Sequence, residues 1–456
     1  MSENIRTVEN ATCTFCGCVC DDMVLTVDLD EKRITKAKNA CVLGRAWFAE
    51  HTIEDAPAAL IDGKPVPVEA AVEEAAQTLV KARFPITYGL SDTTCEAQRQ
   101  AVAITDFIRG TVDTTTSVCH GPSGLAFQGV GESTMTLGEV KNRADLVIYW
   151  GGNPAESHPR HFGRYAVTPK GMFTPNGKKD RYVVLVDVRR TPSVPAANQF
   201  LQVKPGKDFE VLWALRALVK GRKIDPAIEQ ITGVSLAQME DLVGRMKNCR
   251  YGVLFFGMGL TMTRGRHFNS GALLALATDL NEFTHFVAKP VRGHGNVTGA
   301  DNVVSWQTGY PFGVNFSLGY PRFNPGEFTT VDTLSRGDAD AAMIIASDPA
   351  SNFPKAAINH LHRIPVVVLD TKETITSKLA HVAFRTATYG INTAGTVYRM
   401  DDVPITLRKA FDSPFPTDEE ILTAIRKRVQ ELVLAKRGPH GAAAVTRAAA
   451  PLPGLP

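Results

Sequence analysis

The sequence lacks the features that would direct the chain to a membrane, out of the cell or onto a nucleic acid. No apolar run approaches the roughly 18 residues that a membrane-spanning helix needs. The first residues, MSENIRTVENATC, contain neither an apolar signal core nor a twin-arginine pair. The 50 basic and 47 acidic residues leave a net charge of only +3, without a long basic stripe. We therefore expect a cytoplasmic protein that binds neither membrane nor nucleic acid.

The composition also excludes disorder and a small disulfide-rich fold. Hydrophobic residues make up 44% and charged residues 21% of the 456 residues, as in ordinary globular chains. A chain of this length buries a sizeable core and, at roughly 100–200 residues per domain, forms about three domains. A disulfide framework would spread its cysteines over the loops, whereas five of these eight lie within the first 41 residues. Such a cluster indicates a metal site.

Short apolar strands alternate with amphipathic helices after about residue 60. The predicted strands are 85–90, 144–150, 181–188, 251–257, 341–347 and 364–370, and the predicted helices are 68–83, 95–109, 209–221, 236–248, 267–280 and 418–437. This alternation is typical of the α/β class, and the number of strands predicts two doubly wound parallel sheets. Residues 290–330 are rich in Gly, Pro and aromatic residues, and we interpret them as a long ordered loop.

The amino-terminal cysteines have the spacing Cys13-x2-Cys16-x3-Cys20, and Cys41 follows after twenty residues. Three thiolates close together, with a fourth returning from a distance, can ligate a [4Fe–4S] cluster. Structural zinc normally shows two short Cys-x2-Cys knuckles, and only one is present here. Zinc and unliganded structural thiols remain the alternatives to the cluster that we favour. Cys18 is the spare thiol inside the loop, and we do not expect it to be a ligand.

A single cysteine further along the chain, Cys119, is followed directly by His120. A thiolate is a soft metal ligand or a nucleophile, and an adjacent histidine can relay a proton. A lone cysteine between secondary-structure elements is more often a small buried side chain, so these two residues alone leave both roles open.

Four of the predicted strands end in loops rich in Gly, Asn, Asp, Ser and Arg. In open parallel sheets, ligands bind at the carboxyl ends of the strands, where Gly turns and helix N-termini bind phosphates. None of the loops matches G-x-G-x-x-G or a P-loop, and tight turns would explain any one of them. Four such loops in two sheets favour an extended ligand with several phosphates.

Several segments between residues 10 and 430 together carry a family resemblance. They include CTFCGCVCDD, SVCHGPS, HPRH, RGHGNVTG and GTVYRM. On these segments the chain resembles the molybdopterin oxidoreductase superfamily, on its formate dehydrogenase side. More closely, it resembles the family formed by the B subunits of formylmethanofuran dehydrogenases, to which the B subunits of bacterial formyltransferase/hydrolase complexes are related.

The resemblance implies a tungsten or molybdenum ion held by two pyranopterin guanine dinucleotides and one protein cysteine, which is matched by Cys119. It also implies that His120 handles a proton and that Arg292 orients CO2 or formate. The implied [4Fe–4S] ligands, which pass electrons to the metal, are Cys13, Cys16, Cys20 and Cys41. The strand-end loops become the dinucleotide cradle, and the expected contacts are Gly152, Asn153, Asp187, Arg189, Thr191, Gly257, Gly259, Ser347 and Asp348.

The implied activity is the interconversion of CO2 and formate by the catalytic subunit of a formylmethanofuran dehydrogenase-type complex in one-carbon metabolism. The relatives' catalytic chain also has a carboxy-terminal β-barrel, and this chain is too short to contain one. We therefore expect a separate β-barrel subunit that completes pterin binding. Beside it we expect an amidohydrolase-like subunit, with methanofuran or methylofuran as the substrate of the complex.

An alternative is a non-redox subunit of a bacterial formyltransferase/hydrolase complex, which turns formyl-methylofuran into formate. Two departures from the family pattern favour it: the segment Ala394-Gly395-Thr396, where the family usually has Glu-Gly-Thr, and the Ala- and Pro-rich tail. The retained cysteines, histidine and arginine favour the redox role. A third possibility is a structural iron–sulfur or zinc protein of unrelated activity.

The expected domain organisation follows from these assignments. An iron–sulfur domain covers 1–60, and a dinucleotide-binding α/β domain covers 119–299. A second, discontinuous α/β domain combines 61–118 with 300–437, and a disordered tail covers 438–456.

Overall fold

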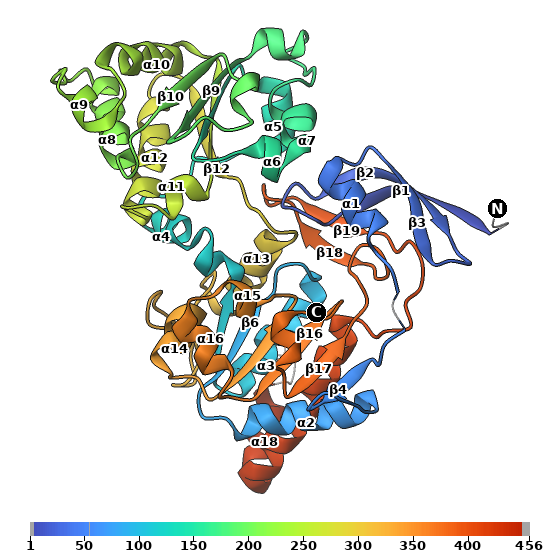
Figure 1. Cartoon of the computed structure of the whole chain (residues 1–456). Helices are drawn as coiled ribbons and strands as arrows, with labels where there is room; N and C mark the ends of the chain where they lie inside the picture. The colour runs from blue at the N-terminus through green and yellow to red at the C-terminus, as the bar shows by residue number, and fades with distance from the viewer. Residues whose placement is uncertain (1–3, 54, 449–456) are drawn as a thin grey trace. The chain divides into compact units, whose positions relative to one another are not determined.

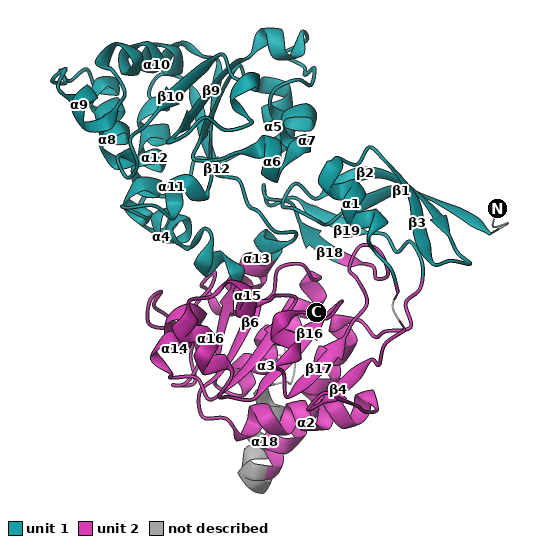
Figure 2. Cartoon of the chain, in the orientation of Figure 1, with its two compact units in different colours: residues 1–52, 115–299, 396–411 teal, residues 53–114, 300–395, 412–456 magenta. Residues whose placement is uncertain are grey.

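A computed structural model describes residues 4–53 and 55–448 of the chain (Figure 1). The chain divides into two compact units, each assembled from three separate stretches (Figure 2). Unit 1 combines Met1–Thr52, Thr115–Gly299 and Thr396–Phe411, and unit 2 combines Ile53–Thr114, Ala300–Gly395 and Asp412–Pro456. The cysteine-rich segment therefore belongs to the same unit as Cys119 and Arg292.

Unit 1 contains a five-stranded sheet in the order β10-β9-β8-β11-β12, in which all neighbouring strands are parallel. The strands are β8 (Leu146–Trp150), β9 (Tyr182–Asp187), β10 (Gln199–Gln202), β11 (Tyr251–Phe256) and β12 (His285–Pro290). The strand that comes first in the chain lies in the middle, so the order reverses between β8 and β11. Such a reversal opens a crevice at the carboxyl ends of the two strands, where ligands of doubly wound sheets bind.

Several helices of unit 1 accompany this sheet, and three of them lie where the sequence predicted helices, at 209–221, 236–248 and 267–280. The helices are α4 (Gly121–Val130), α5 (Leu137–Arg143), α8 (Asp208–Val219), α10 (Leu236–Asn248) and α12 (His267–Leu280). Leu215, Leu242 and Leu273 of three of these helices pack with Ile148 and Leu254 of the sheet in one buried cluster. In α10, the buried Met239, Leu242, Val243 and Met246 recur at helical spacing, so one face of that helix is buried.

The amino-terminal part of unit 1 is a three-stranded antiparallel sheet followed by a short helix. The elements are β1 (Ile5–Cys13), β2 (Cys20–Asp28), β3 (Arg33–Lys38) and α1 (Val42–Ala49). A two-stranded sheet, β18 (Gly395–Tyr398) and β19 (Pro404–Leu407), lies later in the chain, and β19 contacts β1.

Unit 2 contains a nine-stranded mixed sheet in the order β14-β13-β7-β6-β15-β16-β17-β4-β5. Its central strands are parallel: β6 (Pro85–Gly89), β7 (Thr111–Thr114), β15 (Ala341–Ile345), β16 (Val366–Asp370) and β17 (Val382–Arg385). The antiparallel flanks are β13 (Val314–Asn315), β14 (Arg322–Phe323), β4 (Ala59–Ile61) and β5 (Lys64–Pro65). The parallel core has the order 2-1-3-4-5 along the chain, with its reversal between β6 and β15. The predicted α/β class is confirmed, and unit 2 adds antiparallel strands to it.

The helices of unit 2 include α2 (Val68–Lys81), α3 (Cys95–Phe107), α14 (Thr330–Arg336), α16 (Lys355–Leu361) and α18 (Asp418–Ala448). In α2, Ala71, Val72, Ala75 and Leu79 recur at helical spacing and are buried. No helix among the described residues is both long enough and apolar enough to span a bilayer.

Two stretches differ from the sequence-based expectation. The interpretation of 290–330 as one long loop is wrong, because α13 (Val297–Thr308) and the strands β13 and β14 lie within it. The buried side chains Ala300, Val303 and Val304 stabilise α13, although its β-branched residues have low helix propensity. Helix α18 extends past 437 to Ala448, where we expected the disordered tail to have begun, and residues 449–456 of that tail lie outside the described residues.

Candidate active site

The amino-terminal cysteines meet in one cavity of unit 1. Cys13 at the end of β1 pairs with Cys20 at the start of β2, so the hairpin loop between them carries Cys16 and Cys18. Cys41 is the N-cap residue of α1. All five cysteines line the same cavity. The spacing in the sequence thus corresponds to one hairpin and one helix start that face each other.

The residues around this cavity suit an iron–sulfur cluster chemically. All eight cysteines of the chain are free thiols. A Cβ added at Gly44 would lie 3.0 Å from Cys13 Sγ and 3.9 Å from Cys41 Sγ, so the glycine keeps the space beside two sulfurs open. Apart from His158 and Arg160, the other lining residues are apolar or sulfur-bearing. Within the described ranges, no three or more His, Cys, Asp or Glu side chains are arranged to hold a metal ion. The fit therefore rests on the donor set, which is the one that cubane clusters use.

Charge and hydrogen bonding differ among the cysteines. A hydrogen bond from Cys18 lowers the pKa of Cys20 to about 6, against the effect of burial, and the charges of Arg160 and Arg164 act in the same direction. Hydrogen bonds to its two neighbouring cysteines, together with burial, raise the pKa of Cys18 far above its ordinary value. Burial also raises the pKa of Cys13. Cys18 thus stays a thiol that donates to its neighbours, and a bound cation would have to displace the proton of Cys13.

The cysteine loop packs against the segment that follows β12. Gly17 N donates to Gly293 O at 3.0 Å, and Cys16 forms an isolated antiparallel bridge with His294. A Cβ on Gly17 would lie 2.3 Å from Arg292 O, so no larger residue fits without displacing backbone. The structure therefore brings the predicted cluster loop and the predicted arginine into direct main-chain contact.

Arg292 is buried and is held at both its side chain and its backbone. Its Nη2 donates to Thr116 Oγ1 at 2.5 Å, and its carbonyl oxygen accepts a hydrogen bond from His158 Nε2 at 2.7 Å. Because a carbonyl only accepts, His158 carries its proton on Nε2, while its Nδ1 lies 2.8 Å from Ser157 Oγ. Burial lowers the pKa of His158 to about 4, so its ring stays neutral. His158 also lines the cysteine cavity and thus contacts both parts of the site.

Cys119 lies between the short 3-10 helix η1 (Thr115–Val118) and α4. Its backbone N donates to Thr116 O at 3.0 Å, and its carbonyl oxygen accepts from Thr261 Oγ1 at 3.2 Å. Thr116 therefore contacts both the backbone of Cys119 and the guanidinium of Arg292. Two of the three predicted catalytic residues, Cys119 and Arg292, thus share this threonine as a common support.

The ring of His120 is buried beside Cys119. Its Nδ1 lies 3.2 Å from Ser123 Oγ, and its Nε2 has no hydrogen-bond partner among the residues that the structure describes. Burial lowers the pKa of His120 to about 3, and the charge of Arg292 adds to this effect. A buried ring nitrogen without a partner is the kind of group that a bound molecule satisfies.

The predicted cradle residues of unit 1 lie where β8, β9 and β11 end. Gly257 N donates to Trp150 O at 3.0 Å, and Gly259 N donates to Gly151 O at 2.9 Å. A Cβ on Gly257 would lie 2.5 Å from Gly151 O. The loops after β8 and β11 therefore pack against each other through their main chains, at the point where the strand order reverses. The predicted contacts gathered at this edge are Gly152, Asn153, Asp187, Arg189, Thr191, Gly257 and Gly259.

Ser347 and Asp348 occupy the corresponding position in unit 2, just after β15. A Cβ on Gly89, at the end of the neighbouring β6, would lie 3.0 Å from Ser347 Cβ. Asp348 Oδ1 accepts hydrogen bonds from Thr376 N at 2.8 Å and from Thr376 Oγ1 at 2.6 Å. Asp348 thus fixes the start of α17 (Ile375–Lys378), a structural role that the sequence did not reveal.

No protein-family model matches the chain. Over 438 residues it is 43% identical to the B subunit of tungsten-containing formylmethanofuran dehydrogenase 2 of Methanocaldococcus jannaschii, and the match covers 94% of this chain and 100% of that protein. The chain belongs to the family of formylmethanofuran dehydrogenase B subunits. This confirms the resemblance that the sequence motifs carried.

Two further likenesses are to bacterial proteins. The B subunit of the formyltransferase/hydrolase complex Fhc of Methylorubrum extorquens is 25% identical over 393 residues, which are 83% of this chain and 99% of that protein. A solved structure of the formyltransferase/hydrolase complex from the same organism matches with a TM-score of 0.66 and 24% identity. It covers 82% of this chain and 99% of the matched chain. At that identity, the structural match shows that the fold is shared.

Within this formylmethanofuran dehydrogenase family member, three residues beside the cysteine cavity were not singled out by sequence reasoning. They are His158, Arg160 and Arg164. The segment HPRH contributed to the family resemblance, but its spacing matches no known ligand pattern. The signal that the sequence offered for these residues was the presence of two histidines and an arginine around the proline of HPRH.

Proposed function

We propose that the chain is the catalytic B subunit of a formylmethanofuran dehydrogenase-type complex and that it interconverts CO2 and formate. The observation that carries the proposal is the 43% identity to a tungsten-containing family member over 94% of the chain. The shared contacts of Thr116 with Cys119 and Arg292 support it, because a ligand and a substrate-binding group must be held together.

Cys119 would hold the tungsten or molybdenum ion of a bis(pyranopterin guanine dinucleotide). The two strand-order reversals suit the dinucleotides, because ligands of doubly wound sheets bind at the carboxyl ends of such strands, and the glycines there let the strand-end loops pack closely together. The partnerless Nε2 of His120 also suits a site that a bound group completes. When bound, this cofactor supplies the two-electron chemistry between CO2 and formate. Cys13, Cys16, Cys20 and Cys41 would hold the [4Fe–4S] cluster.

Arg292 would bind and orient the substrate. A guanidinium stays protonated even when buried, and its planar fork matches a carboxylate such as formate. The hydrogen bond to Thr116 fixes one side of the fork, and the bond from His158 to the Arg292 carbonyl fixes the backbone. His120 would lie beside the substrate with a neutral ring, because burial lowers its pKa to about 3, and would pass a proton on at Nε2 rather than retain it.

The non-redox subunit of a formyltransferase/hydrolase complex is the second candidate, favoured by the shared fold with the Methylorubrum extorquens complex. In that role, Cys119 and the four cysteines would bind no metal. In either role we propose a hetero-oligomer, since the named relatives are subunits of complexes. The proposed partners are an amidohydrolase-like subunit and a β-barrel subunit, with methanofuran or methylofuran as the carrier.

Elemental analysis of the purified complex separates the two candidates. The dehydrogenase role requires about one tungsten or molybdenum and about four iron atoms per copy of this chain. Iron without tungsten or molybdenum would refute it. Hydrolysis of a formylated carrier by a complex without these metals would establish the second candidate.

The variant Cys119→Ser tests the metal ligand directly. A serine oxygen is a harder ligand than a thiolate, so we expect the loss of viologen-linked formate oxidation while the cluster's EPR signal remains. The control is Cys249→Ser, because the Cys249 thiol donates to Met246 O, at 3.2 Å, at the end of α10. Equal activity of the two variants would remove Cys119 from the proposed site.

A further inference from the structure

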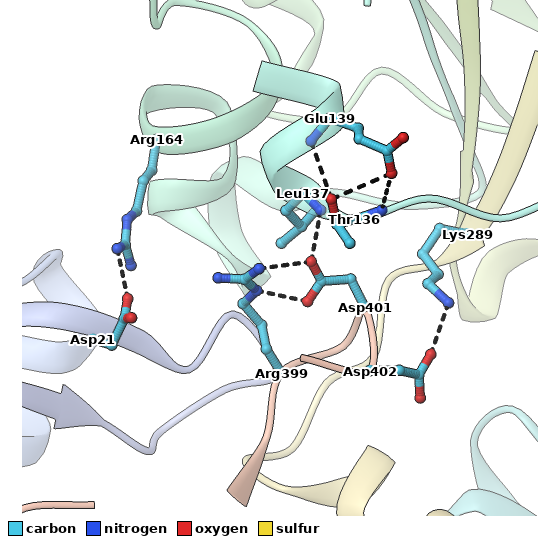
Figure 3. A network of polar contacts seen from close by, with 9 residues as sticks. All are labelled: Asp21, Thr136, Leu137, Glu139, Arg164, Lys289, Arg399, Asp401 and Asp402. Carbon is cyan, nitrogen blue, oxygen red and sulfur yellow. Dashed lines mark hydrogen bonds and ion pairs between the residues drawn. The ribbon is translucent and has the colours of Figure 1, made fainter. Parts of the chain in front are cut away.

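Two arginines of one short helical segment lie against the cysteine hairpin. Arg160 belongs to α7 (Pro159–His161), and Arg164 belongs to the following π-helical turn η2 (Phe162–Ala166). Arg160 Nη1 and Nη2 donate to the two carboxylate oxygens of Asp22 at 2.5 and 2.6 Å. Arg164 Nη2 lies 2.6 Å from Asp21 Oδ1, and Figure 3 shows this pair facing across the two segments. Both aspartates directly follow Cys20, so the arginines engage the hairpin beside a proposed ligand.

The charges of these ion pairs sum to zero, but the positive and negative groups differ in their position relative to the cavity. Arg160 lines the cavity, whereas neither aspartate does. The arginine side chains are 21% and 20% exposed, and the aspartate side chains are 36% and 37% exposed. Solvent therefore screens the two negative charges more than the two positive ones. The cavity thus experiences a net positive potential from these groups.

The position of Arg164 is fixed by more than its ion pair. The ring of Tyr165 lies beneath the guanidinium of Arg164, 5.0 Å from its centroid, and near that of Arg399, at 5.4 Å. Arg164 Nη1 also lies 3.3 Å from Asp22 Oδ1, which joins the two ion pairs into one group. A cation that is ordered in this way acts on its surroundings without first reorganising.

We propose that Arg160 and Arg164 set the reduction potential of the cluster that the amino-terminal cysteines would hold. One electron enters on reduction, no bond forms or breaks, and the cluster with its thiolates becomes more negative by one charge. Nearby positive charge stabilises that reduced form and so raises the potential. The inference rests on the proposed function only in requiring the cluster.

The experiment uses two substitutions that each remove one charge of the Arg160–Asp22 ion pair. In the purified complex, Arg160→Gln removes the positive charge and Asp22→Asn removes the negative one. Electrostatic tuning predicts shifts of opposite sign in an EPR-monitored redox titration, negative for Arg160→Gln and positive for Asp22→Asn. We expect each to change the ratio of reduced to oxidised cluster about tenfold at a fixed potential, or about 59 mV for a one-electron couple.

Two further variants complete the comparison. Arg160→Lys keeps the charge and should leave the potential near that of the wild type. Arg336→Gln breaks an exposed ion pair with Asp338 in unit 2 and should cause no shift. Shifts of equal sign, no shift, or loss of iron from both Arg160→Gln and Asp22→Asn would each overturn the inference, because the pair would then only hold the fold. Absence of iron from the wild-type complex is a separate result, which refutes the cluster itself.

Discussion

Gly17→Ala is the substitution for which the structure gives the most definite expectation. The added Cβ would lie 2.3 Å from Arg292 O and 3.1 Å from the carbon of the same carbonyl. Both are backbone atoms, so the contact can be relieved only by moving one main chain away from the other. Overpacking of this kind costs about 1–3 kcal/mol. The hydrogen bonds of Gly17 to Gly293 and Met400, at 3.0 and 2.9 Å, would each contribute about 1 kcal/mol to the loss if they broke.

The same displacement should reach the substrate. If Arg292 orients formate, a backbone shift of about 1 Å lowers turnover by up to roughly 100-fold. Differential scanning calorimetry of the purified complex and viologen-linked formate oxidation measure the two effects. For a unit of this size, each kcal/mol lowers the melting temperature by about 2–4 °C.

Gly129→Ala is the matched control for Gly17→Ala. Gly129 lies in α4, and a Cβ there would meet no atom within 4 Å. Alanine is favoured over glycine in a helix by up to about 1 kcal/mol, so this variant should be as stable as the wild type or more stable. A Gly17→Ala protein with wild-type melting temperature and turnover would refute the inferred contact between the cysteine loop and Arg292.

Three further expectations test other parts of the molecule. Arg292→Lys keeps the charge but loses the planar fork, so formate turnover should fall by roughly 100-fold, and an unchanged rate would show that Arg292 does not touch substrate. Asp401→Ala should lower the free energy of unfolding, measured by urea titration, by about 3–5 kcal/mol. The Arg399 guanidinium, which donates to Asp401 at 2.6 and 2.7 Å (Figure 3), would lose its buried partner. A decrease below about 1 kcal/mol would contradict this. Burial, with the neighbouring Asp418, raises the pKa of Asp370 to about 7, so its contribution to stability is lost as the pH rises toward and through 7. Asp370→Asn should therefore melt above the wild type at pH 8, with a difference that shrinks toward pH 4, and a pH-independent difference would refute the assignment.

Local patterns in the sequence predicted local structure well. The predicted helices 236–248 and 267–280 coincide with α10 and α12, and apolar residues of both lie in the buried cluster with the sheet. Helix α13 was missed because Gly299 and its β-branched residues mask its periodicity, while burial of Val303 and Val304 stabilises it in the folded chain. Propensity is overridden there by tertiary packing, which a single sequence does not display.

The candidate site shows the same division between local and distant information. The cysteine spacing predicted a common site, and the cysteines do line one cavity, because a hairpin and a helix start bring them together. The hydrogen bond from His158 to Arg292 joins residues 134 positions apart and left no local pattern. Asp348 was predicted as a ligand contact from its position, and the structure adds that its carboxylate accepts hydrogen bonds from Thr376 at the start of α17.

The contacts around Arg292 have a consequence for the interpretation of variants in the cysteine cavity. Gly17 from the cysteine loop and His158 from the cavity wall both bind the backbone of Arg292 and Gly293. A substitution that collapses the cavity therefore moves the arginine as well as removing the cluster. Slower turnover alone cannot then be assigned to electron transfer. A displaced arginine lowers kcat/KM for formate, whereas a slower electron path lowers kcat and leaves kcat/KM for formate unchanged, so kcat/KM separates the two causes.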